Sequence, residues 1–295
     1  MKEVRLAKKG EITGQKEIWK LCFGDEDPYI DFYYSNRYKE DETALLLLNG
    51  EITSMLTMLP VKIVTPVKQS IDSAMLYAIA THPKHQKKGL ASELMDFSKK
   101  HLKSKRIETS ILVPAEKDLF DFYYKQGYQD GFYIREIQLT QDRIEELPIY
   151  KTCKLNINPV VSEGYNFIRN EYLCSKMYVE FSNADIEYQK KLSRLTGGEI
   201  YEIEVDGRKG CVAIENLSSE KVMIKEILVP EEYINLAIGH ITHLLNAKEY
   251  IVRTPAFLGE SLGGVIRPFG MIQGFVNIYD KNTHDNLGYL GLAFD

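Results

Sequence analysis

The spacing of apolar residues changes its period once within residues 75–103. The first six residues form an unbroken apolar run that stops before Pro83, which predicts a buried strand. A short basic turn ends at Gly89, and from Leu90 apolar residues recur at helical spacing with charges between them. The pattern therefore predicts a strand, a tight polar turn and a helix in direct succession.

The predicted turn has the features of an anion site. Where a turn meets a helix start, several backbone N–H groups lack partners, and the helix dipole favours negative charge there. Gly89 has no side chain, so a ligand can approach the backbone closely. This chemistry predicts a cradle for a phosphate or pyrophosphate group. The stretch has neither the G-x-G-x-x-G of dinucleotide folds nor the G-x-x-x-x-G-K-[ST] of P-loops.

Turn signals and aromatic residues predict further elements in the first half. The dipeptide Asn49-Gly50 lies between two apolar runs, which predicts a β-hairpin. Residues 109–113 predict a short strand. The aromatic segment 119–128 predicts a helix that Gly127 closes in the left-handed conformation.

Residues 160–295 repeat parts of this order. Asp206-Gly207 joins two alternating runs, as in the first hairpin. Val222–Pro230 is similar to Met75–Pro83, and Arg267–Met271 is similar to Tyr124–Tyr128. The repeat predicts two related domains, at 1–145 and 150–295.

The second copy lacks the anion chemistry. After Pro230 come Glu231 and Glu232, where the first copy has its basic turn, and two carboxylates there would repel a pyrophosphate. We therefore expect the second domain to serve structure or acceptor binding. An unrelated α/β domain is the alternative.

Composition narrows the class of protein. At 295 residues, with 44% hydrophobic and 27% charged residues, the chain is typical of a soluble two-domain protein. No apolar run approaches the ~18 residues that span a bilayer, and the start has no apolar signal-peptide core. We expect a cytoplasmic protein without a membrane partner. Four widely spaced cysteines predict free thiols and no metal site: Cys22, Cys153, Cys174 and Cys211.

Charge is unevenly distributed along the chain. The net charge is −5, yet residues 81–106 carry eight Lys and Arg against two acidic residues. A local basic patch on an acidic protein favours a phosphorylated ligand over nucleic acid, which usually requires a basic domain. For Lys99 to Arg106 a solvated helix face is the favoured interpretation.

Two motifs resemble the GNAT superfamily of N-acetyltransferases. The segment Gln86–Ala91, which follows Pro83, resembles their acetyl-CoA loop [QR]-x-x-G-x-[GA]. Phe122–Tyr128 resembles their helix end F-Y-x-K-x-G-[FY]. The resemblance implies an α/β (α+β) fold, with a mixed, mostly antiparallel GNAT sheet followed by a second, degenerate GNAT-like domain.

Paired GNAT-like halves are similar to the first two domains of the enhanced-intracellular-survival type acetyltransferases. That family adds a sterol-carrier-like third domain, for which we find no counterpart, so its broad acceptor range cannot simply be transferred to this chain. The resemblance implies an acyl-CoA-dependent N-acyltransferase that moves an acetyl group from acetyl-CoA to a primary amine. The expected acceptor is a small molecule or a peptide.

The resemblance also assigns residues to the acetyl-CoA site. Strand backbone would bind the pantetheine arm and polarise the thioester, and N–H groups of the turn would hold the pyrophosphate. The assigned residues are Ile79, Ala80, Thr81, Gln86, Lys87, Lys88, Gly89, Leu90, Ala91 and Ser92.

Tyr123 matches the tyrosine that protonates the departing thiolate in this superfamily, with Tyr124 as the alternative should the register differ. The general base stays open between a water relay and several groups: Glu51, His82, Glu116 and the terminal carboxylate of Asp295.

Other classes of function stay open at this stage. A non-catalytic acyl-CoA-binding or sensor protein would also need the loop, but not Tyr123. Doubled GNAT folds also occur in aminoacyl and long-chain acyl transferases, although nothing in the sequence indicates a tRNA site or a long acyl channel. A homo-oligomer is compatible with the sequence.

Overall fold

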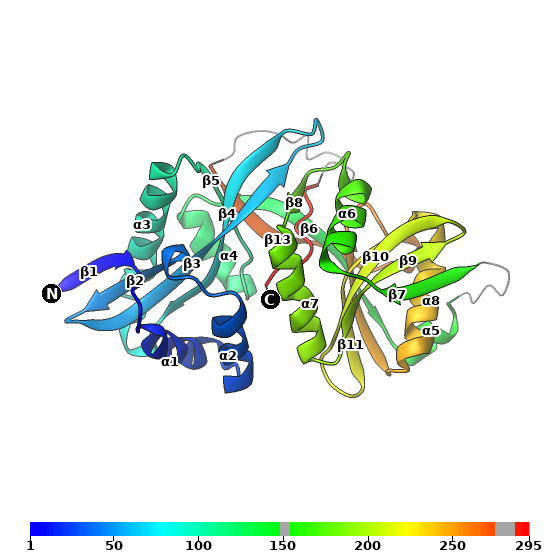
Figure 1. Ribbon diagram of the computed structural model, residues 1–295, viewed down its shortest axis with the longest axis horizontal. Coiled ribbons are helices and arrows are strands. Elements are labelled where there is room, and N and C mark those ends of the chain that lie inside the picture. The colour runs from blue at the N-terminus through cyan, green and yellow to red at the C-terminus, as the bar shows by residue number, and fades with distance from the viewer. Residues whose placement is uncertain (148–153, 275–286, 295) are drawn as a thin grey trace. The chain divides into compact units, whose positions relative to one another are not determined.

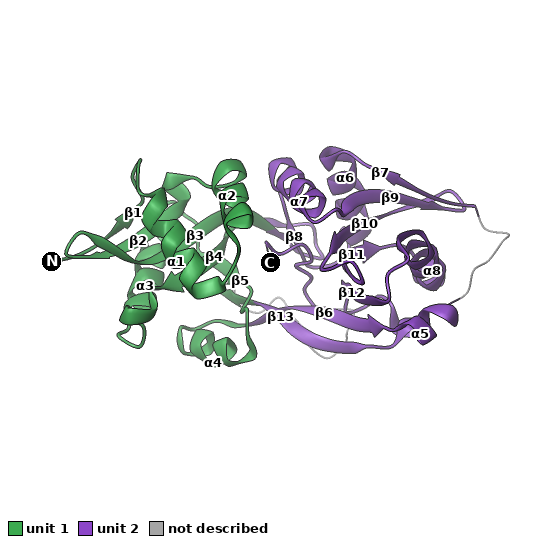
Figure 2. Ribbon diagram, turned by 90° about the horizontal axis from the view of Figure 1, so that it is seen from below, with its two compact units in different colours: residues 1–62, 71–129, 271–276 green, residues 63–70, 130–270, 277–295 purple. Residues whose placement is uncertain are grey.

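The structure is a computed structural model, and it describes residues 1–147, 154–274 and 287–294 (Figure 1). Cys153 and Asp295 therefore lie outside the described residues. The chain divides into two compact units, coloured separately in Figure 2. Unit 1 comprises residues 1–62, 71–129 and 271–276, and unit 2 comprises residues 63–70, 130–270 and 277–295.

Unit 1 contains a sheet with helices on both faces. In spatial order its strands are β1 (Lys2–Leu6), β2 (Thr43–Leu48), β3 (Glu51–Val64), β4 (Ser70–Thr81), β5 (Thr109–Leu112) and the end of β13 (Val265–Gln273). Its helices are α1 (Ile12–Phe23), α2 (Asp27–Asn36), α3 (Leu90–Ser104) and α4 (Lys117–Lys125), with 3-10 turns η1 (Glu40–Glu42) and η2 (Pro83–His85).

Alternation along the strands separates the two helical layers. Leu76 of β4 belongs to a buried cluster that includes Leu94 of α3 and Tyr123 of α4. The next residue, Tyr77, faces the opposite side, where its ring lies 5.7 Å from that of Trp19 on α1. The strand thus contacts α3 and α4 through one face, and α1 through the other.

The β2–β3 hairpin confirms the turn prediction. Asn49 and Gly50 both have positive φ, 51° and 88°, as a two-residue type I′ turn requires. Leu48 pairs with Glu51 directly across this turn.

β13, the last strand among the described residues, contributes to unit 1. Met271 of β13 pairs with Leu112 of β5, and Gln273 pairs with Ser110, both in antiparallel orientation. The earlier residues of β13 belong to unit 2, where β13 lies next to β6. One strand therefore takes part in both units.

Unit 2 has the same kind of sheet. Its strands are most of β6 (Gln129–Leu139), β7 (Leu155–Pro159), β8 (Tyr178–Glu180), β9 (Glu199–Val205), β10 (Arg208–Asn216), β11 (Lys221–Leu228), β12 (Glu249–Pro255) and the start of β13. Its helices are α5 (Gln141–Glu145), α6 (Ser162–Leu173), α7 (Asn183–Leu195) and α8 (Ile234–Leu245), with 3-10 turns η3 (Glu231–Tyr233) and η4 (Glu260–Leu262).

The internal repeat is visible in the strand pairing. Asp206 and Gly207 repeat the positive-φ hairpin turn, with φ of 48° and 81°. β11 pairs with β12 in parallel, as β4 does with β5. Seven other pairs are antiparallel: β1–β2, β2–β3, β5–β13, β6–β12, β7–β9, β9–β10 and β10–β11. The mixed, mostly antiparallel sheet is thereby confirmed, and unit 2 repeats the pairing pattern of unit 1. The boundaries 1–145 and 150–295 stay a prediction.

One part of the predicted repeat is wrong. Arg267–Met271 does not end a helix, because it lies inside strand β13. Gly259, Gly263 and Gly264 precede it with positive φ, a conformation that interrupts a helix. Only the short η4 forms where the first half has α4.

Three of the four cysteines lie within the described residues. Cys22, Cys174 and Cys211 are free thiols. Within the described ranges, no helix is both long and apolar enough to cross a membrane.

Candidate active site

The basic turn forms the predicted cradle at the start of α3. Gly89 is the N-cap of α3 with φ 77°, and the first helical hydrogen bond runs from the Glu93 N–H to the Gly89 carbonyl, 3.1 Å. Lys87 also has positive φ, 60°. In the described part of the chain, no backbone carbonyl accepts from the N–H groups of residues 87–92. These donors are free for an anion.

The space in front of Gly89 suits a pyrophosphate. A Cβ placed on Gly89 would meet no atom within 4 Å, so the approach to the backbone is open. Lys84 and Lys87 are exposed beside it, and the Lys88 ammonium donates to the Lys84 carbonyl, 3.1 Å. An open approach, free N–H groups and nearby cations together suit an anionic group.

Side chains around Thr81 fix the end of β4 against the turn. The Gln86 amide donates to the Thr81 carbonyl, 3.2 Å, and the Cys22 thiol donates to the same oxygen, 3.2 Å. The Thr81 hydroxyl lies 2.9 Å from that of Ser54. Thr81 and Gln86 thus have structural contacts through which they place the cradle.

Strand β4 is irregular where the thioester is expected. Ala78 has φ 49°, a left-handed conformation inside a strand. The paired residues of β4 and β5 end at Leu76 and Leu112, while β4 continues to Thr81. A bulge turns backbone groups out of the strand ladder. Tyr77, Ala78 and Ile79 are only half-buried, although their neighbours on both sides are buried.

Tyr123 lies in the same buried cluster as Leu76 and Leu90, and Ile79 packs against that cluster. The Tyr123 ring is buried, but its hydroxyl oxygen keeps some solvent-accessible surface. This hydroxyl has no hydrogen-bond partner among the described residues. Burial, and then the neighbouring Tyr128, raises the pKa of the Tyr123 phenol far above its ordinary value. The phenol therefore stays protonated and can act as a donor. Tyr124 is 43% exposed.

The structure does not favour His82 as a base. Its Nδ1 accepts from the Lys84 backbone N–H, 3.2 Å, which gives the ring a capping role in η2. Glu116 is the N-cap residue of α4, without a side-chain capping bond, and Glu51 is an exposed residue at the hairpin turn. The described residues identify no base.

Aromatic side chains of α1 and α2 cover the other face of β4. The rings of Trp19 and Tyr33 lie 5.7 and 5.6 Å from that of Tyr77. The Trp19 indole N–H donates to Asp25, 2.8 Å. Tyr77 directly precedes the bulge, so these rings form one wall next to the expected thioester position.

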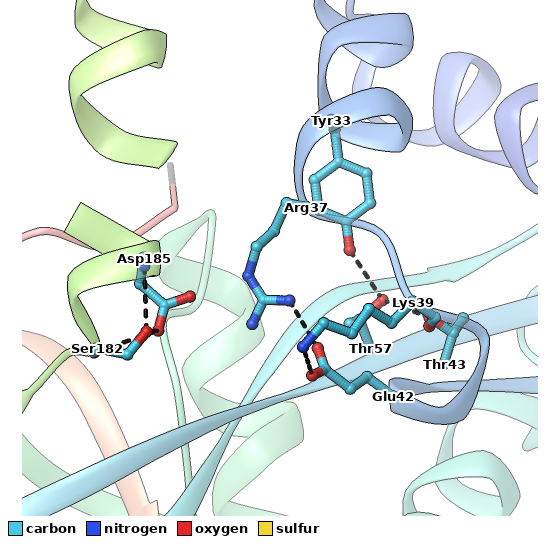
Figure 3. A network of polar contacts seen from close by, with 8 residues as sticks. All are labelled: Tyr33, Arg37, Lys39, Glu42, Thr43, Thr57, Ser182 and Asp185. Carbon is cyan, nitrogen blue, oxygen red and sulfur yellow. Dashed lines mark hydrogen bonds and ion pairs between the residues drawn. The ribbon is translucent and has the colours of Figure 1, made fainter. Parts of the chain in front are cut away.

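Polar contacts anchor α2 to the sheet (Figure 3). The Tyr33 hydroxyl donates to Thr57 of β3, 3.3 Å, and burial raises the pKa of this phenol. After α2, Arg37 and Lys39 both pair with Glu42, at 2.7 and 2.8 Å. Figure 3 also shows Ser182 and Asp185, which form a capping box at the start of α7.

The equivalent positions of unit 2 are filled by its own charged side chains. In the repeat, Lys225 corresponds to Ala78, and the β10–β11 register skips this residue, so the bulge is retained. The Lys225 ammonium pairs with Glu215, 3.1 Å, and both are buried. Glu231 accepts from the Gly259 N–H, 2.6 Å, so a carboxylate stands where the first copy offers Lys84.

Glu226, which corresponds to Ile79, is held in a fully buried network. Arg169 of α6 pairs with it at 3.0 Å, and the Tyr165 hydroxyl donates to it, 2.8 Å. The Arg169 guanidinium also donates to the carbonyls of Val179 and Leu290, at 2.8 and 2.9 Å. The position in unit 2 that corresponds to Ile79 is therefore occupied by the side chains of Glu226 and its partners.

Comparison with known proteins gives one family match. Residues 3–130, somewhat less than half of the chain, match the family described as acetyltransferase (GNAT) domain. This part of the chain is therefore similar to a GNAT acetyltransferase domain. No curated protein sequence shows a significant match to the chain.

Solved structures share the fold across both halves. A GCN5-related N-acetyltransferase from Anabaena variabilis has a TM-score of 0.74 at 15% identity, covering 93% of this chain and 73% of that one. A conserved protein from Enterococcus faecalis, described as a probable N-acyltransferase, has a TM-score of 0.69 at 16% identity, covering 92% and 72%. Eis1 from Mycobacterium abscessus has 0.65 at 12% identity, covering 92% and 73%. The tandem arrangement expected from the sequence is therefore confirmed at the level of the fold.

Most predicted site residues lie in two connected regions of unit 1. The bulged strand carries Ile79, Ala80 and Thr81, although Ala80 itself is buried. The turn and the first turn of α3 carry the others, with Leu90 buried in the core beneath them. Sequence reasoning missed Gln126 and Gln273, since position 126 is unspecified in the helix-end motif and residue 273 is remote in the chain.

Proposed function

We propose that the chain is an acyl-CoA-dependent N-acetyltransferase that transfers the acetyl group of acetyl-CoA to a primary amine of a small molecule or peptide. The observation that carries this proposal is the bulged end of β4 leading into the open N–H cradle at Gly89. A bulged strand supplies unpaired backbone groups to a thioester, and the cradle suits a pyrophosphate. One chain segment, from β4 to the start of α3, thus supplies both the thioester site and the pyrophosphate site.

The reaction forms a bond from the amine nitrogen to the acetyl carbon and breaks the carbon–sulfur bond. The nitrogen loses one proton, and the departing thiolate takes one up. Backbone N–H groups near Ile79 would stabilise the charge that develops on the carbonyl oxygen, an effect of about 3 kcal/mol per donor. The cradle residues Gln86 to Ser92 would hold the pyrophosphate.

Tyr123 would meet the departing sulfur. A CoA thiol has a pKa of about 8.5, well below that of the buried phenol, so complete transfer of the phenolic proton is uphill. Tyr123 would therefore stabilise the thiolate chiefly as a hydrogen-bond donor, and the thiolate can complete its protonation from solvent.

The amine must lose a proton to act as a nucleophile. For an alkyl amine with a pKa near 10.4, this costs about 4.6 kcal/mol at pH 7. A water relay could remove this proton, and an acetyl acceptor whose amine has a lower pKa would lose it more easily. The general base stays open between water and Glu51, His82, Glu116 or the terminal carboxylate of Asp295.

The competing function is that of an acyl-CoA-binding sensor. It would need the cradle but give no role to the free hydroxyl of Tyr123, and that hydroxyl favours the enzyme. The two functions separate in one experiment: release of free CoA from acetyl-CoA, measured with a panel of small amines and amine-terminal peptides. Amine-dependent CoA release that disappears in Gly89→Glu supports the enzyme. Tight binding of acetyl-CoA with no release above the amine-free reaction would indicate a sensor.

A further inference from the structure

Gln126 connects three elements of unit 1. Its side-chain amide donates to the Ser92 hydroxyl in the first turn of α3, 3.0 Å. Its backbone carbonyl accepts from the Gln273 amide at the end of β13, 2.5 Å. Its backbone N–H donates to the Tyr123 carbonyl, 3.0 Å. One residue thus contacts the cradle helix, the last strand and the helix that carries Tyr123.

The end of α4 is shaped to receive Gln273. Gly127 has φ 86°, and a Cβ on it would lie 2.8 Å from the Gln273 amide nitrogen. The glycine therefore makes room for this amide as well as ending the helix. Met271, two residues earlier on β13, belongs to the same buried cluster as Tyr123. Polar and apolar contacts of β13 together hold the end of α4.

The hydrogen bond from Gln126 orients the Ser92 hydroxyl. A hydroxyl that accepts from an amide uses an oxygen lone pair and keeps its own O–H for donation. In the described part of the chain, no acceptor takes the Ser92 O–H. Ser92 lies in the first turn of α3, among the free N–H groups of residues 87–92. Its O–H is an additional donor for an anion in the cradle.

We propose that Gln126, held by Gln273, is a positioning residue that fixes Tyr123 relative to the cradle and directs the Ser92 hydroxyl toward the pyrophosphate. This inference rests on the proposed binding of acetyl-CoA in the cradle. It assigns a role to β13, the last strand among the described residues: this strand completes the catalytic unit and sets the position of α4, the helix that carries Tyr123.

The test begins with equilibrium binding of CoA to full-length variants, which needs no acceptor. Ser92→Ala and Gln126→Met are each expected to weaken CoA binding about 10-fold, the factor for one hydrogen bond to a charged group. Because both remove the same interaction, the double variant should weaken binding by the same factor and not by the product. Ser92→Thr keeps the hydroxyl and should retain the affinity.

Turnover with an amine found in the panel tests the contact between Gln273 and Gln126. Gln273→Met is expected to lower kcat about 10-fold, since it frees the end of α4 and displaces Tyr123. The KM for acetyl-CoA should change less than in Gln126→Met, because Gln273→Met keeps the amide that donates to Ser92. Gln126→Met should change both constants. Gln129→Met is the matched control, because Gln129 is exposed near the same turn.

The outcomes separate the two proposals. A wild-type chain that binds no CoA overturns the proposed function itself. If the wild type binds CoA and the double variant shows the product of the single effects, the link between Gln126 and Ser92 is wrong. If Gln273→Met melts like the wild type and keeps its kcat, β13 has no positioning role.

Discussion

The ring of Tyr123 packs edge-on against that of Tyr128, with 6.1 Å between the ring centroids. Of the two phenols, Tyr128 is already engaged, because its hydroxyl lies 2.7 Å from that of Ser110. The Tyr123 hydroxyl has no partner in the described part of the chain. The pair therefore consists of one structural phenol and one that is free for a ligand.

Tyr123→Phe is expected to lower kcat about 10²-fold and to leave CoA affinity nearly unchanged. The hydroxyl acts when the thiolate departs, while the ring that fills the core is retained. Steady-state kinetics and calorimetry with CoA check the two parts. Tyr124→Phe is the control, because Tyr124 lies 43% exposed on another side of α4. Damage from Tyr124→Phe alone would mean that the motif register is shifted by one residue.

Tyr128 predicts a loss of stability at alkaline pH. Burial raises the pKa of Tyr128 to about 12, whereas a phenol in the unfolded chain titrates near 10. Below pH 10 the full stabilisation is present. From pH 10 to 12 the unfolded chain binds fewer protons than the folded one, so the unfolding free energy falls by up to about 1.4 kcal/mol per pH unit for this group.

Urea titrations at a series of pH values measure this slope. In Tyr128→Phe the slope should become smaller, while stability at pH 7 falls by about 1 kcal/mol through the lost Ser110 hydrogen bond. An unchanged slope would show that Tyr128 titrates normally in the folded chain.

Gly89→Glu is expected to abolish CoA binding, because the new side chain and its charge enter the open space of the cradle. The backbone at Gly89 has positive φ, so part of any effect comes from strain. Gly50→Glu is a matched control: Gly50 also has positive φ and open space, but lies in the β2–β3 turn. Calorimetry should find CoA binding intact in Gly50→Glu. Equal loss in both variants would point to strain and not to the cradle.

The fully buried pair of Arg169 and Glu226 predicts strong coupling in unit 2. Glu226→Gln leaves a buried guanidinium without a counter-charge and should cost about 3–5 kcal/mol of stability. Replacing both residues, as in Arg169→Met with Glu226→Leu, removes the unpaired charge but should recover only part of this loss, because the Val179 and Leu290 carbonyls and the Tyr165 hydroxyl lose their partners. Removing one partner of the exposed pair Arg208–Glu232 should cost less than about 1 kcal/mol. Chemical denaturation of the three variants checks the ranking.

One CoA per chain is expected to bind, because unit 2 fills its equivalent positions with Lys225, Glu226 and Glu231. Calorimetric titration gives the stoichiometry directly. Two equivalent sites would contradict the inference that Glu231, at the position of Lys84, excludes an anion from unit 2.

Local patterns predicted those parts of the molecule that depend on neighbouring residues. The hairpin at Asn49-Gly50, the strand–turn–helix around Gly89 and the helix end at Gly127 follow from turn chemistry and periodicity. The similarity of Arg267–Met271 to the helix end was misleading. These residues form a strand because they lie in β13, which pairs with β5, and a short motif carries no information on such distant pairing.

The contacts that link distant residues were not predictable. The amide of Gln273 reaches Gln126 only because β13 pairs with β5, and strand order is a property of the whole sheet. The ion pair of Arg169 and Glu226 likewise joins a helix and a strand far apart in the sequence. A single sequence shows these residues as ordinary polar positions.

The place of β13 in the sheet has a consequence for synthesis of the protein on the ribosome. Domains usually fold as they emerge, beginning with the N-terminal one. Here β5 emerges early, but its antiparallel neighbour ends at Gln273. Unit 1 cannot close its sheet until Gln273 has been translated, and the edge of β5 stays unpaired meanwhile. The nascent chain would thus depend on holding factors that shield an exposed strand edge, and a ribosome stalled in unit 2 would leave an aggregation-prone fragment.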